Sequence, residues 1–512
     1  MALSQPGKES KARESSLDID DESLRELATE FVRLATDYFA NVTEGPVFPN
    51  VTGEQIKARF DAPPPLAKEP LKKILADCDA VIDGIRHNGH PRFFGYVASP
   101  STPAGAFADL LASSLNASVT SWRSSPAATE VERTVVRWLG SLIGYDDEAQ
   151  GLLTSGGSMA NLNALLIAHR AKAGVPVAQV GIRGTPAPMI IYASDQVHLS
   201  ITKAADILGL GQDCVRLLPS DGHFCLDTTA LSSAIDHDRS AGFKPFCVIG
   251  SAGTAATGAI DSLTEIARIA RENDLWFHID GAYGAPAAMV EECRTAFAGL
   301  ELADSISLDP HKWLYTPVDC GCLLFHDGAT ARKAFVTEAD YIKVHELSET
   351  ESFAFWDYGI ELSRRFRALK VWLTLKYYGA ARLIEAIRDD IAMAHYMAER
   401  VEAEPDLELL APVQLSICCF RYLPAKLRAQ IDAKDSAAGR EHLNLQLNRL
   451  NERIMHRVQR GGRAYLSNAM LRGQFALRAC IINFRTTRAD IDLTLETVRE
   501  AAHEIEAEDE SN

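Results

Sequence analysis

The sequence predicts an α/β protein built around a mainly parallel β-sheet. From about residue 150 onward, short apolar runs alternate with longer stretches of helical periodicity. The runs are apolar on both faces, which is typical of parallel strands that helices cover on each side. Six runs predict strands at 151–153, 189–192, 247–250, 275–279, 305–308 and 322–325.

The length of the chain predicts more than one structural region. With 512 residues it is too long for one simple core, so we expect a large domain with smaller parts beside it. Residues 1–19 are polar and charged and are expected to be a disordered lead-in. We expect a helical segment at 20–95, the large domain at 96–385 and a small α+β domain at 386–512.

The first predicted helix begins at Asp20 or Asp21, since either side chain is a good helix cap. Apolar residues follow at spacings of three and four, which predicts one apolar face. Either the main body of the protein or a partner subunit has to cover this face. The face consists of Leu24, Leu27, Phe31, Leu34 and Tyr38.

The second half of the chain is expected to hold a long loop and the small domain. Residues 326–358 are polar and poorly periodic, and a loop of that length is usually functional or mobile. A helix is expected at 364–378. Apolar runs at 415–420 and 476–484 predict strands, and helical stretches flank them.

Composition and charge exclude several classes of protein. A net charge of −17 argues against a nucleic-acid or anionic-membrane partner, because both attract basic surfaces. The first residues lack the apolar stretch of a signal peptide, and no apolar run approaches the ~20 residues of a membrane span. The ten cysteines form no C-x-x-C pair and are expected to be free thiols. We therefore expect a cytoplasmic protein, and no cluster of residues indicates a metal site.

Lys312 and Asp280 carry the strongest chemical signal. Lys312 lies in a Pro-His-Lys-Trp segment directly after the predicted strand at 305–308, and Asp280 ends the predicted strand at 275–279. Ligands bind at such strand ends in α/β sheets. Pyridoxal 5′-phosphate (PLP) needs a lysine for its aldehyde and a carboxylate for its pyridine nitrogen. Separately, the two residues also fit a surface lysine and a helix cap, but together they indicate a PLP enzyme.

Two further segments fit a PLP site. The Ser-Gly-Gly-Ser segment at 155–158 lies between a predicted strand and a predicted helix, where glycines and a helix N-terminus suit a phosphate. Such a turn is common, so by itself it indicates little. His198 begins the next predicted helix, and its imidazole could stack on the cofactor ring, although a lone histidine there is usually a cap.

These motifs, in this order, resemble the group II PLP-dependent amino-acid decarboxylases, which include the aromatic L-amino-acid decarboxylases. The resemblance extends from about residue 20 to 490, and the Pro-His-Lys-Trp segment with its upstream aspartate is its most specific part. The matching segments are 90–94, 122–130, 154–161, 195–198, 253–254, 278–283, 309–314 and 364–367.

The resemblance implies a PLP fold-type I protein with a seven-stranded sheet in its large domain. It also implies an obligate homodimer with active sites at the subunit interface, where the N-terminal helices wrap the partner. Lys312 would bind the cofactor aldehyde, Asp280 the pyridine nitrogen, and His198 would stack on the ring. Asp309 stands where the family often has asparagine. The residues expected around the phosphate are Gly157, Ser158, Asp309 and His311.

The resemblance further implies how the reaction ends. A gap-free alignment between Lys312 and the 364–367 segment places the family's loop tyrosine on Tyr341. In decarboxylases of this kind the loop tyrosine is thought to protonate the substrate carbon after carbon dioxide leaves. Relatives with phenylalanine there tend to be oxygen-consuming aldehyde synthases. Tyr341 and His198 together favour simple decarboxylation to an amine.

The substrate is predicted less sharply. Several of the residues that line the pocket in the aromatic enzymes are here smaller or more polar than the bulky apolar residues common in those relatives. The mapped residues are Tyr96, Val97, Ala98, Ser99, Ser118 and Thr120. Ser363 stands where plant relatives with phenolic substrates have serine. An aromatic L-amino acid is the first choice, ahead of an acidic or diamino acid.

Three other functions fit parts of the sequence. An aldehyde synthase is the closest alternative, and hydrogen peroxide release would identify it. An aminotransferase is disfavoured, because Pro-His-Lys-Trp is not its usual lysine context. A catalytically silent PLP-fold protein that acts as a binding partner is disfavoured by the intact set of Lys312, Asp280, His198 and Tyr341.

Overall fold

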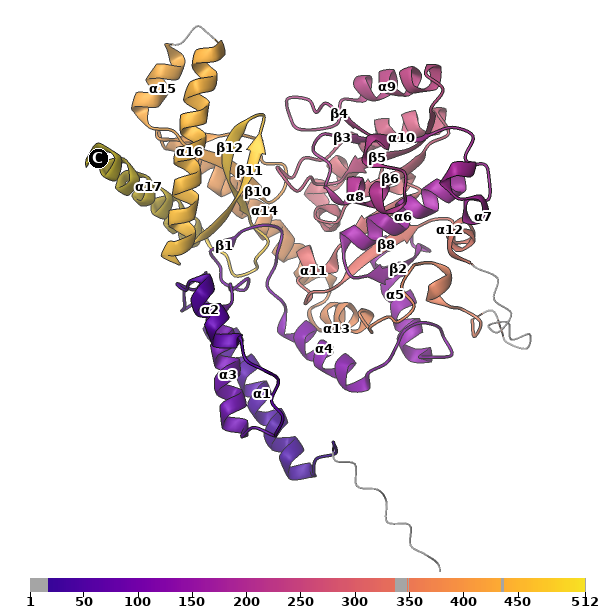
Figure 1. Cartoon of the computed structure of the whole chain (residues 1–512), viewed down its shortest axis with the longest axis horizontal. Helices are drawn as coiled ribbons and strands as arrows, with labels where there is room; N and C mark the ends of the chain where they lie inside the picture. The colour runs from indigo at the N-terminus through magenta and orange to yellow at the C-terminus, as the bar shows by residue number, and fades with distance from the viewer. Residues whose placement is uncertain (1–16, 337–347, 349, 434–436, 512) are drawn as a thin grey trace, which may run out of the picture. The chain divides into compact units, whose positions relative to one another are not determined.

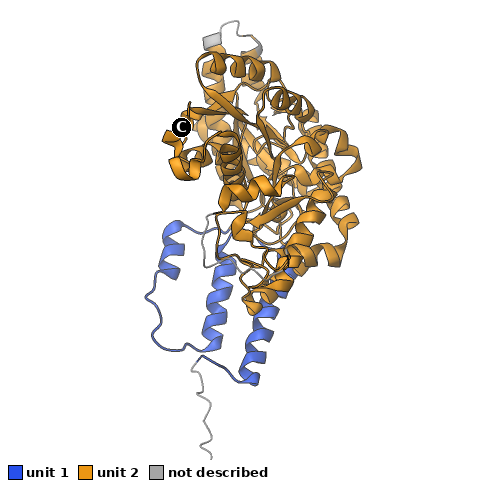
Figure 2. Cartoon of the chain, turned by 90° about the vertical axis from the view of Figure 1, so that its right-hand side faces the viewer, with its two compact units in different colours: residues 1–45, 49–86 blue, residues 46–48, 87–512 orange. Residues whose placement is uncertain are grey.

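The computed structural model describes residues 17–336, 348, 350–433 and 437–511. The chain divides into two compact units, which Figure 2 colours separately. The first unit comprises residues 1–45 and 49–86, and the second comprises residues 46–48 and 87–512. Across the described residues, no helix has both the length and the apolar character needed to cross a membrane.

The first unit contains three helices: α1 Asp21–Asn41, α2 Gly53–Phe60 and α3 Leu71–Gly84. The predicted cap of the first helix is confirmed, because Asp20 accepts a hydrogen bond from the Ser23 backbone N–H at 2.8 Å. Within the predicted apolar face, Leu34 is buried. Leu24 and Phe31 remain 53% and 43% exposed, so this chain leaves much of the face uncovered.

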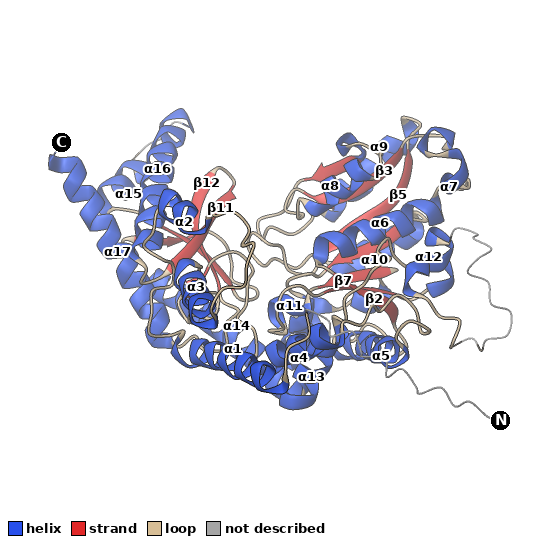
Figure 3. Cartoon of the chain, turned by 60° about the horizontal axis from the view of Figure 1, so that its bottom comes forward, coloured by secondary structure: helices blue, strands red, loops and turns tan. Residues whose placement is uncertain are grey.

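The second unit contains the predicted mainly parallel sheet, drawn in red in Figure 3. It has seven strands in the order β2-β8-β7-β6-β5-β3-β4, which confirms the fold class. Only β4 was missed, because it is four residues long and Arg216 interrupts its apolar character. The strands are β2 Gln150–Thr154, β3 Met189–Ser194, β4 Val215–Leu218, β5 Lys244–Ser251, β6 Trp276–Asp280, β7 Ser305–Leu308 and β8 Gly321–Phe325.

Strand direction brings the chemistry to one edge of this sheet. The pairs β3–β4, β3–β5, β5–β6 and β6–β7 are parallel, whereas β8 is antiparallel to both β7 and β2. The carboxyl ends of β2, β3, β5, β6 and β7 therefore share one edge. Ligand sites in α/β sheets form outside this edge.

Helices pack against the sheet, and every residue of β3, β6, β7 and β8 is buried, so both faces are covered there. This burial explains the continuous apolar runs in the sequence. Figure 1 labels the helices of this part of the chain. Those that contact the large sheet are α5 Pro126–Leu142, α6 Gly157–Lys172, α8 Ser200–Ile207, α9 Thr228–Ser240, α10 Leu263–Glu272 and α11 Pro310–Trp313. The others are α4 Pro103–Leu115, α7 Val177–Val180, α12 Gly328–Phe335 and α13 Ala368–Tyr378; of these, α4 and α13 pack on one another and α12 packs on α6.

A second sheet of five strands, in the order β1-β11-β12-β10-β9, draws mostly on the C-terminal part of the chain. Its first strand comes from far upstream, because β1 pairs in parallel with β11 through Phe93 and Tyr465. The strands are β1 Phe93–Phe94, β9 Leu407–Leu409, β10 Ile417–Tyr422, β11 Tyr465–Leu471 and β12 Gln474–Cys480. The accompanying helices are α14 Ala380–Ala403, α15 Ala425–Asp432, α16 Ala437–Gly461 and α17 Arg488–Ser511.

Three predicted boundaries were wrong. The helix expected at 364–378 begins at Ala368, because the buried Arg364 side chain reaches Glu132 and holds the preceding residues in an extended connection. The strand expected at 476–484 ends at Cys480. The loop expected at 326–358 contains α12, which Asp327 caps by accepting from the Thr330 backbone N–H at 3.0 Å. The domain boundaries stay predictions.

Candidate active site

A cavity of about 780 Å³ lies at the carboxyl edge of the large sheet, within the second unit. One side consists of strand ends and the loops that follow them, and the other consists of residues from β11 and β12. Its lining includes eight residues predicted to act in the site: Tyr96, Gly157, Ser158, His198, Asp280, Asp309, His311 and Lys312.

Lys312 lies in the short helix α11 immediately after β7, as the Pro-His-Lys-Trp segment predicted. Its Nζ is 3.1 Å from Asp309 Oδ2, and its backbone N–H donates to the Asp309 carbonyl at 2.9 Å. The side chain is therefore held in the cavity by a charged partner. This position is inconsistent with an ordinary surface lysine.

Asp390 accepts hydrogen bonds from two residues that follow Lys312. Trp313 Nε1 and the Tyr315 hydroxyl donate to Asp390 Oδ2 at 2.9 and 2.7 Å. The Asn483 backbone N–H donates to Oδ1 at 3.1 Å. Burial raises the pKa of the Asp390 carboxyl to about 7, since these hydrogen bonds only partly replace lost hydration. Helix α14 and the C-terminal chain are thus tied to the turn that carries the lysine.

Asp280 ends β6 and is also firmly held. Its Oδ2 accepts from Asn161 Nδ2 at 3.0 Å. Its Oδ1 accepts from the Ala282 backbone N–H at 3.2 Å and from the Ser307 hydroxyl at 3.3 Å. The carboxylate lies on the cavity wall, so it can also face a ligand that carries positive charge.

The Ser-Gly-Gly-Ser segment forms the start of α6, and its second glycine has no room for a side chain. A Cβ atom at Gly157 would lie 2.8 Å from the Ala282 Cβ and 3.2 Å from Asp309 Oδ2. Among the described residues, no side chain caps this helix. An uncapped helix N-terminus that opens into a cavity presents backbone N–H groups and positive dipole to an anion.

His198 lies just before α8 and lines the same cavity. Its Nδ1 is 2.8 Å from the Ser200 hydroxyl, and the Ser200 backbone N–H points to the same nitrogen at 3.3 Å. Although the ring is exposed toward the cavity, loss of hydration lowers its pKa below the usual 6.5, and nearby Asp280 only partly opposes this shift. This shift favours the neutral imidazole.

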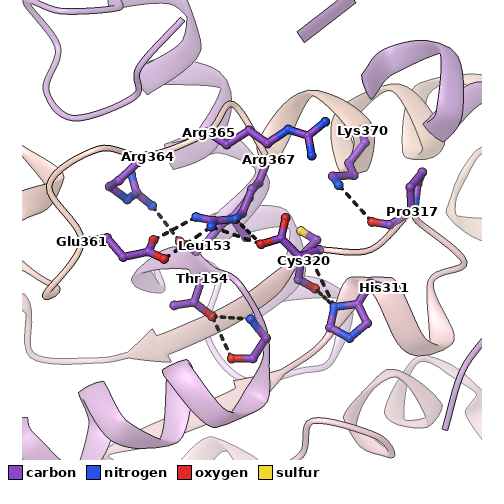
Figure 4. Close-up of polar contacts among 12 residues, drawn as sticks. Leu153, Thr154, His311, Pro317, Cys320, Glu361, Arg364, Arg365, Arg367 and Lys370 are labelled. Atoms are coloured by element: carbon purple, nitrogen blue, oxygen red, sulfur yellow. Dashed lines mark hydrogen bonds and ion pairs between the residues drawn. The ribbon is translucent and has the colours of Figure 1, made fainter. Parts of the chain in front are cut away.

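Cationic side chains from 364–370 make polar contacts with segments near the site, as Figure 4 shows. Arg364 donates to the Leu153 carbonyl at 2.7 Å, at the end of β2. Arg367 pairs with Asp319 at 3.2 Å, and the fully buried Lys370 donates to the Pro317 carbonyl at 3.0 Å. Arg367 and Lys370 thus fix the chain that follows the Lys312 turn, and Arg364 fixes the end of β2.

The predicted substrate-binding residues do not all meet in the cavity. Tyr96 lines it, with a positive backbone φ of 58°. Ser99 is outside the lining and donates to the His311 carbonyl at 3.0 Å. Thr120 donates to the Ser124 hydroxyl at 3.0 Å, and Ser363 is exposed elsewhere on the chain. Tyr341 lies outside the described residues. The roles of all five residues stay predictions.

Arg478 lines the cavity and was missed from the sequence. This β12 side chain is 4% exposed, and it donates from Nε to the Ala256 carbonyl and from Nη1 to the Tyr96 carbonyl. Within the described chain, its Nη2 has no hydrogen-bond partner. A signal was available, because Arg478 is the one charged residue in the apolar run 475–482. A guanidinium at a cavity wall suits a carboxylate ligand.

The residues present fit PLP. A lysine amine, a carboxylate, a neutral imidazole and a glycine-led helix N-terminus converge on one cavity. The helix N-terminus suits a phosphate, and the carboxylate suits a protonated pyridine. One contact differs from expectation, because Asp309 pairs with Lys312, and its Oδ1 has no partner among the described residues.

Comparisons with known proteins agree with this chemistry. Residues 53–423 match the pyridoxal-dependent decarboxylase conserved domain. The chain is 35% identical over 491 residues to an aromatic-L-amino-acid decarboxylase from Bacillus atrophaeus, covering 96% of this chain and 98% of that protein. It is 32% identical over 492 residues to a phenylacetaldehyde synthase from Petunia hybrida, covering 94% and 95%.

A solved structure also resembles this protein. The crystal structure of Oryza sativa TDC with PLP and tryptamine superposes with a TM-score of 0.84 at 28% sequence identity. The match covers 95% of this chain and 99% of that one. The similarity therefore includes the whole framework around the cavity.

Proposed function

Because the chain belongs to the pyridoxal-dependent decarboxylase family, and is thus a PLP-dependent amino-acid decarboxylase, we propose that its substrate is an aromatic L-amino acid. The products would be the corresponding amine and carbon dioxide. One observation supports the reaction above all: Lys312 and Asp280 follow neighbouring strands and line the same cavity.

Each residue has a separate task in this proposal. Bound PLP supplies an electron-accepting ring that is conjugated to the substrate nitrogen. Lys312 would hold the cofactor through its amine, and Asp280 would keep the ring nitrogen protonated by its negative charge. Gly157 leaves space for the phosphate to approach the N-terminus of α6.

His198 and Tyr341 would handle the reacting end of the substrate. A neutral His198 ring can stack on the cofactor and donate a hydrogen bond to the substrate carboxylate. After carbon dioxide leaves, Tyr341 would return a proton to the substrate carbon. An amine is then released.

Two alternative outcomes stay open. Oxidation of the amine carbon would make the protein an aldehyde synthase, the activity named for the Petunia hybrida relative. Arg478 favours a second alternative, an acidic substrate, because its guanidinium at the cavity wall could bind a side-chain carboxylate. The same group could instead bind the α-carboxylate of any amino acid. A diamino acid is disfavoured by a guanidinium in the cavity.

We also propose that the protein works as a homodimer in the cytoplasm. Exposed apolar side chains gather on α1 and on α4, and a second copy of the chain would cover them. On α4 the exposed residues are Phe107, Leu110, Leu111 and Leu115. The prediction that the active site lies at the subunit interface would follow from this assembly.

The test is product analysis with PLP-loaded protein. Aromatic, acidic and diamino L-amino acids are supplied separately, and carbon dioxide, amine, aldehyde and hydrogen peroxide are measured. Equal amounts of amine and carbon dioxide from an aromatic substrate, without peroxide, would support the proposal. Aldehyde with peroxide would identify a synthase, and turnover of an acidic or diamino acid alone would contradict the aromatic assignment. An Asp280→Asn variant serves as the low-activity control.

A further inference from the structure

Asn161 connects Asp280 to the side chain next to His198. This α6 residue is 1% exposed. Its Nδ2 donates to Asp280 Oδ2 at 3.0 Å and to the Ser200 hydroxyl at 2.9 Å. Its Oδ1 lies 3.0 Å from His278 Nε2. Both amide hydrogens and the carbonyl are therefore engaged within the core of the site.

The direction of each hydrogen bond around Asn161 is determined. A carboxylate only accepts, so the amide NH₂ must face Asp280 and the carbonyl must face His278. His278 Nε2 therefore carries a hydrogen. Burial lowers the pKa of this imidazole to about 4, so the ring is neutral and its Nδ1 accepts from Ser305 at 2.9 Å.

The Ser200 side chain extends this hydrogen-bond network to His198. The Ser200 hydroxyl oxygen accepts from Asn161, and its hydrogen can then point to His198 Nδ1 at 2.8 Å. The Ser200 backbone N–H also points to Nδ1 at 3.3 Å. With two donors aimed at Nδ1, a neutral ring has to carry its hydrogen on Nε2.

We propose that Asn161 is a positioning residue that, through Ser200, fixes the Nε2–H tautomer of His198 while it holds Asp280 in place. The tautomer leaves one hydrogen-bond donor on the cavity side of the ring and excludes one at Nδ1. The link between this donor and turnover rests on the proposed function, whereas the assignment of the tautomer rests only on the hydrogen bonds around Asn161 and Ser200.

The experiment is ¹⁵N NMR of the histidine side chains in full-length, PLP-loaded protein. A His198→Gln variant, which lacks the signal, assigns it among the 14 histidines. In the wild type, Nε2 should appear as the protonated nitrogen and Nδ1 as the unprotonated one. A His198 ring that carries its hydrogen on Nδ1 would overturn the proposal.

The decisive variant is Asn161→Asp, which keeps the size of the side chain. The introduced acid would face Asp280 and share a proton with it, so it has no hydrogen for Ser200, whose hydroxyl turns toward it and ceases to donate to His198. We expect an Nδ1–H or doubly protonated population of His198 at neutral pH. We also expect a kcat roughly 10²-fold lower, with KM changed less. Unchanged His198 nitrogen signals would contradict the proposal.

Two further variants keep the test independent of folding defects. Ser200→Ala removes only the hydroxyl link, so it should shift the His198 tautomer in the same direction. Asn163→Asp places the same new acid in α6, where residue 163 is also 1% exposed, and should leave the His198 signals as in the wild type. An equal shift in Asn163→Asp would refute the role of Asn161. If the wild-type protein forms no amine but the variants shift the tautomer as expected, only the proposed function would be overturned.

Discussion

The two walls of the cavity differ in how close in sequence the residues that hold their side chains are. The sheet wall, formed by Gly157, Asp280 and Lys312, holds its side chains through contacts with residues near strand ends. The hairpin wall, formed by residues 467–470 and Arg478, is looser. Met470 is 55% exposed, and Arg478 Nη2 lacks a partner in the described chain. One wall is preorganised for the shared chemistry by contacts between neighbouring segments, whereas the other is held by contacts between distant parts of the chain.

Removing the lysine of the sheet wall should have the largest effect. In Lys312→Ala the cofactor loses its covalent attachment, and we expect kcat to fall by about 10³-fold or more. The absorption band of the lysine-bound cofactor should disappear in the same protein. The matched control is Lys376→Ala, since Lys376 is exposed on α13. Wild-type turnover by Lys312→Ala would refute the assignment of the sheet wall.

Asp390 tests whether the support of the sheet wall depends on pH. Its folded pKa of about 7 lies above the unfolded value of 3.8, so the native state keeps a proton that the unfolded state has released. The free energy of unfolding should therefore fall as pH rises from about 4 to about 7, by up to about 1.4 kcal/mol per pH unit from this group.

The measurement is denaturant unfolding across that pH range. Asp390→Asn should flatten the pH dependence, whereas Asp389→Asn, at an exposed neighbouring position, should not. Parallel curves for the wild type and Asp390→Asn would show that the carboxyl titrates normally in the folded protein.

The hairpin wall should respond mainly in substrate binding. In Arg478→Gln the charged donor is lost, and we expect KM to rise roughly tenfold or more for a substrate whose carboxylate it binds. A rise for acidic substrates alone would place Arg478 at the side chain, and a rise for all substrates would place it at the α-carboxylate. If the KM values of all substrates stay the same, Arg478 has no part in substrate binding. Arg472→Gln, at the tip of the β11–β12 hairpin, is the control.

The smallest effect is expected at Ser363. If its hydroxyl contacts a phenolic substrate, Ser363→Ala should raise KM about 2–10-fold for that substrate and leave other substrates unchanged. Steady-state kinetics with tyrosine and phenylalanine provide the comparison. Equal KM values in wild type and variant would show that Ser363 does not contact the substrate.

The sheet wall could be predicted from sequence because its signals are local. Asp280 and Lys312 each follow an apolar run within a few residues, so strand direction alone brings them to one edge. The Gly157 turn likewise stands directly between a strand and a helix. The same locality explains why six of the seven strands of this sheet were found.

The hairpin wall could not be predicted because its contacts are not local. Arg478 donates to a carbonyl of Tyr96, 382 positions earlier in the chain. Asn161 lay inside a matched segment, yet its bonds to Asp280 and Ser200 depend on how α6 packs on the sheet. The anchoring of Trp313 by Asp390 also joins distant segments. Sequence periodicity contains no information about such pairings.

The parallel pairing of β1 with β11 has a consequence for synthesis on the ribosome. The large sheet ends at Phe325, so it can assemble while the last third of the chain is still being translated. Phe93 pairs with Tyr465, and the Tyr96 backbone N–H donates to Ser467, so both contacts need residues that are translated much later. A nascent chain therefore carries the lysine long before it can close the cavity, and cofactor capture should mark the release of a finished polypeptide.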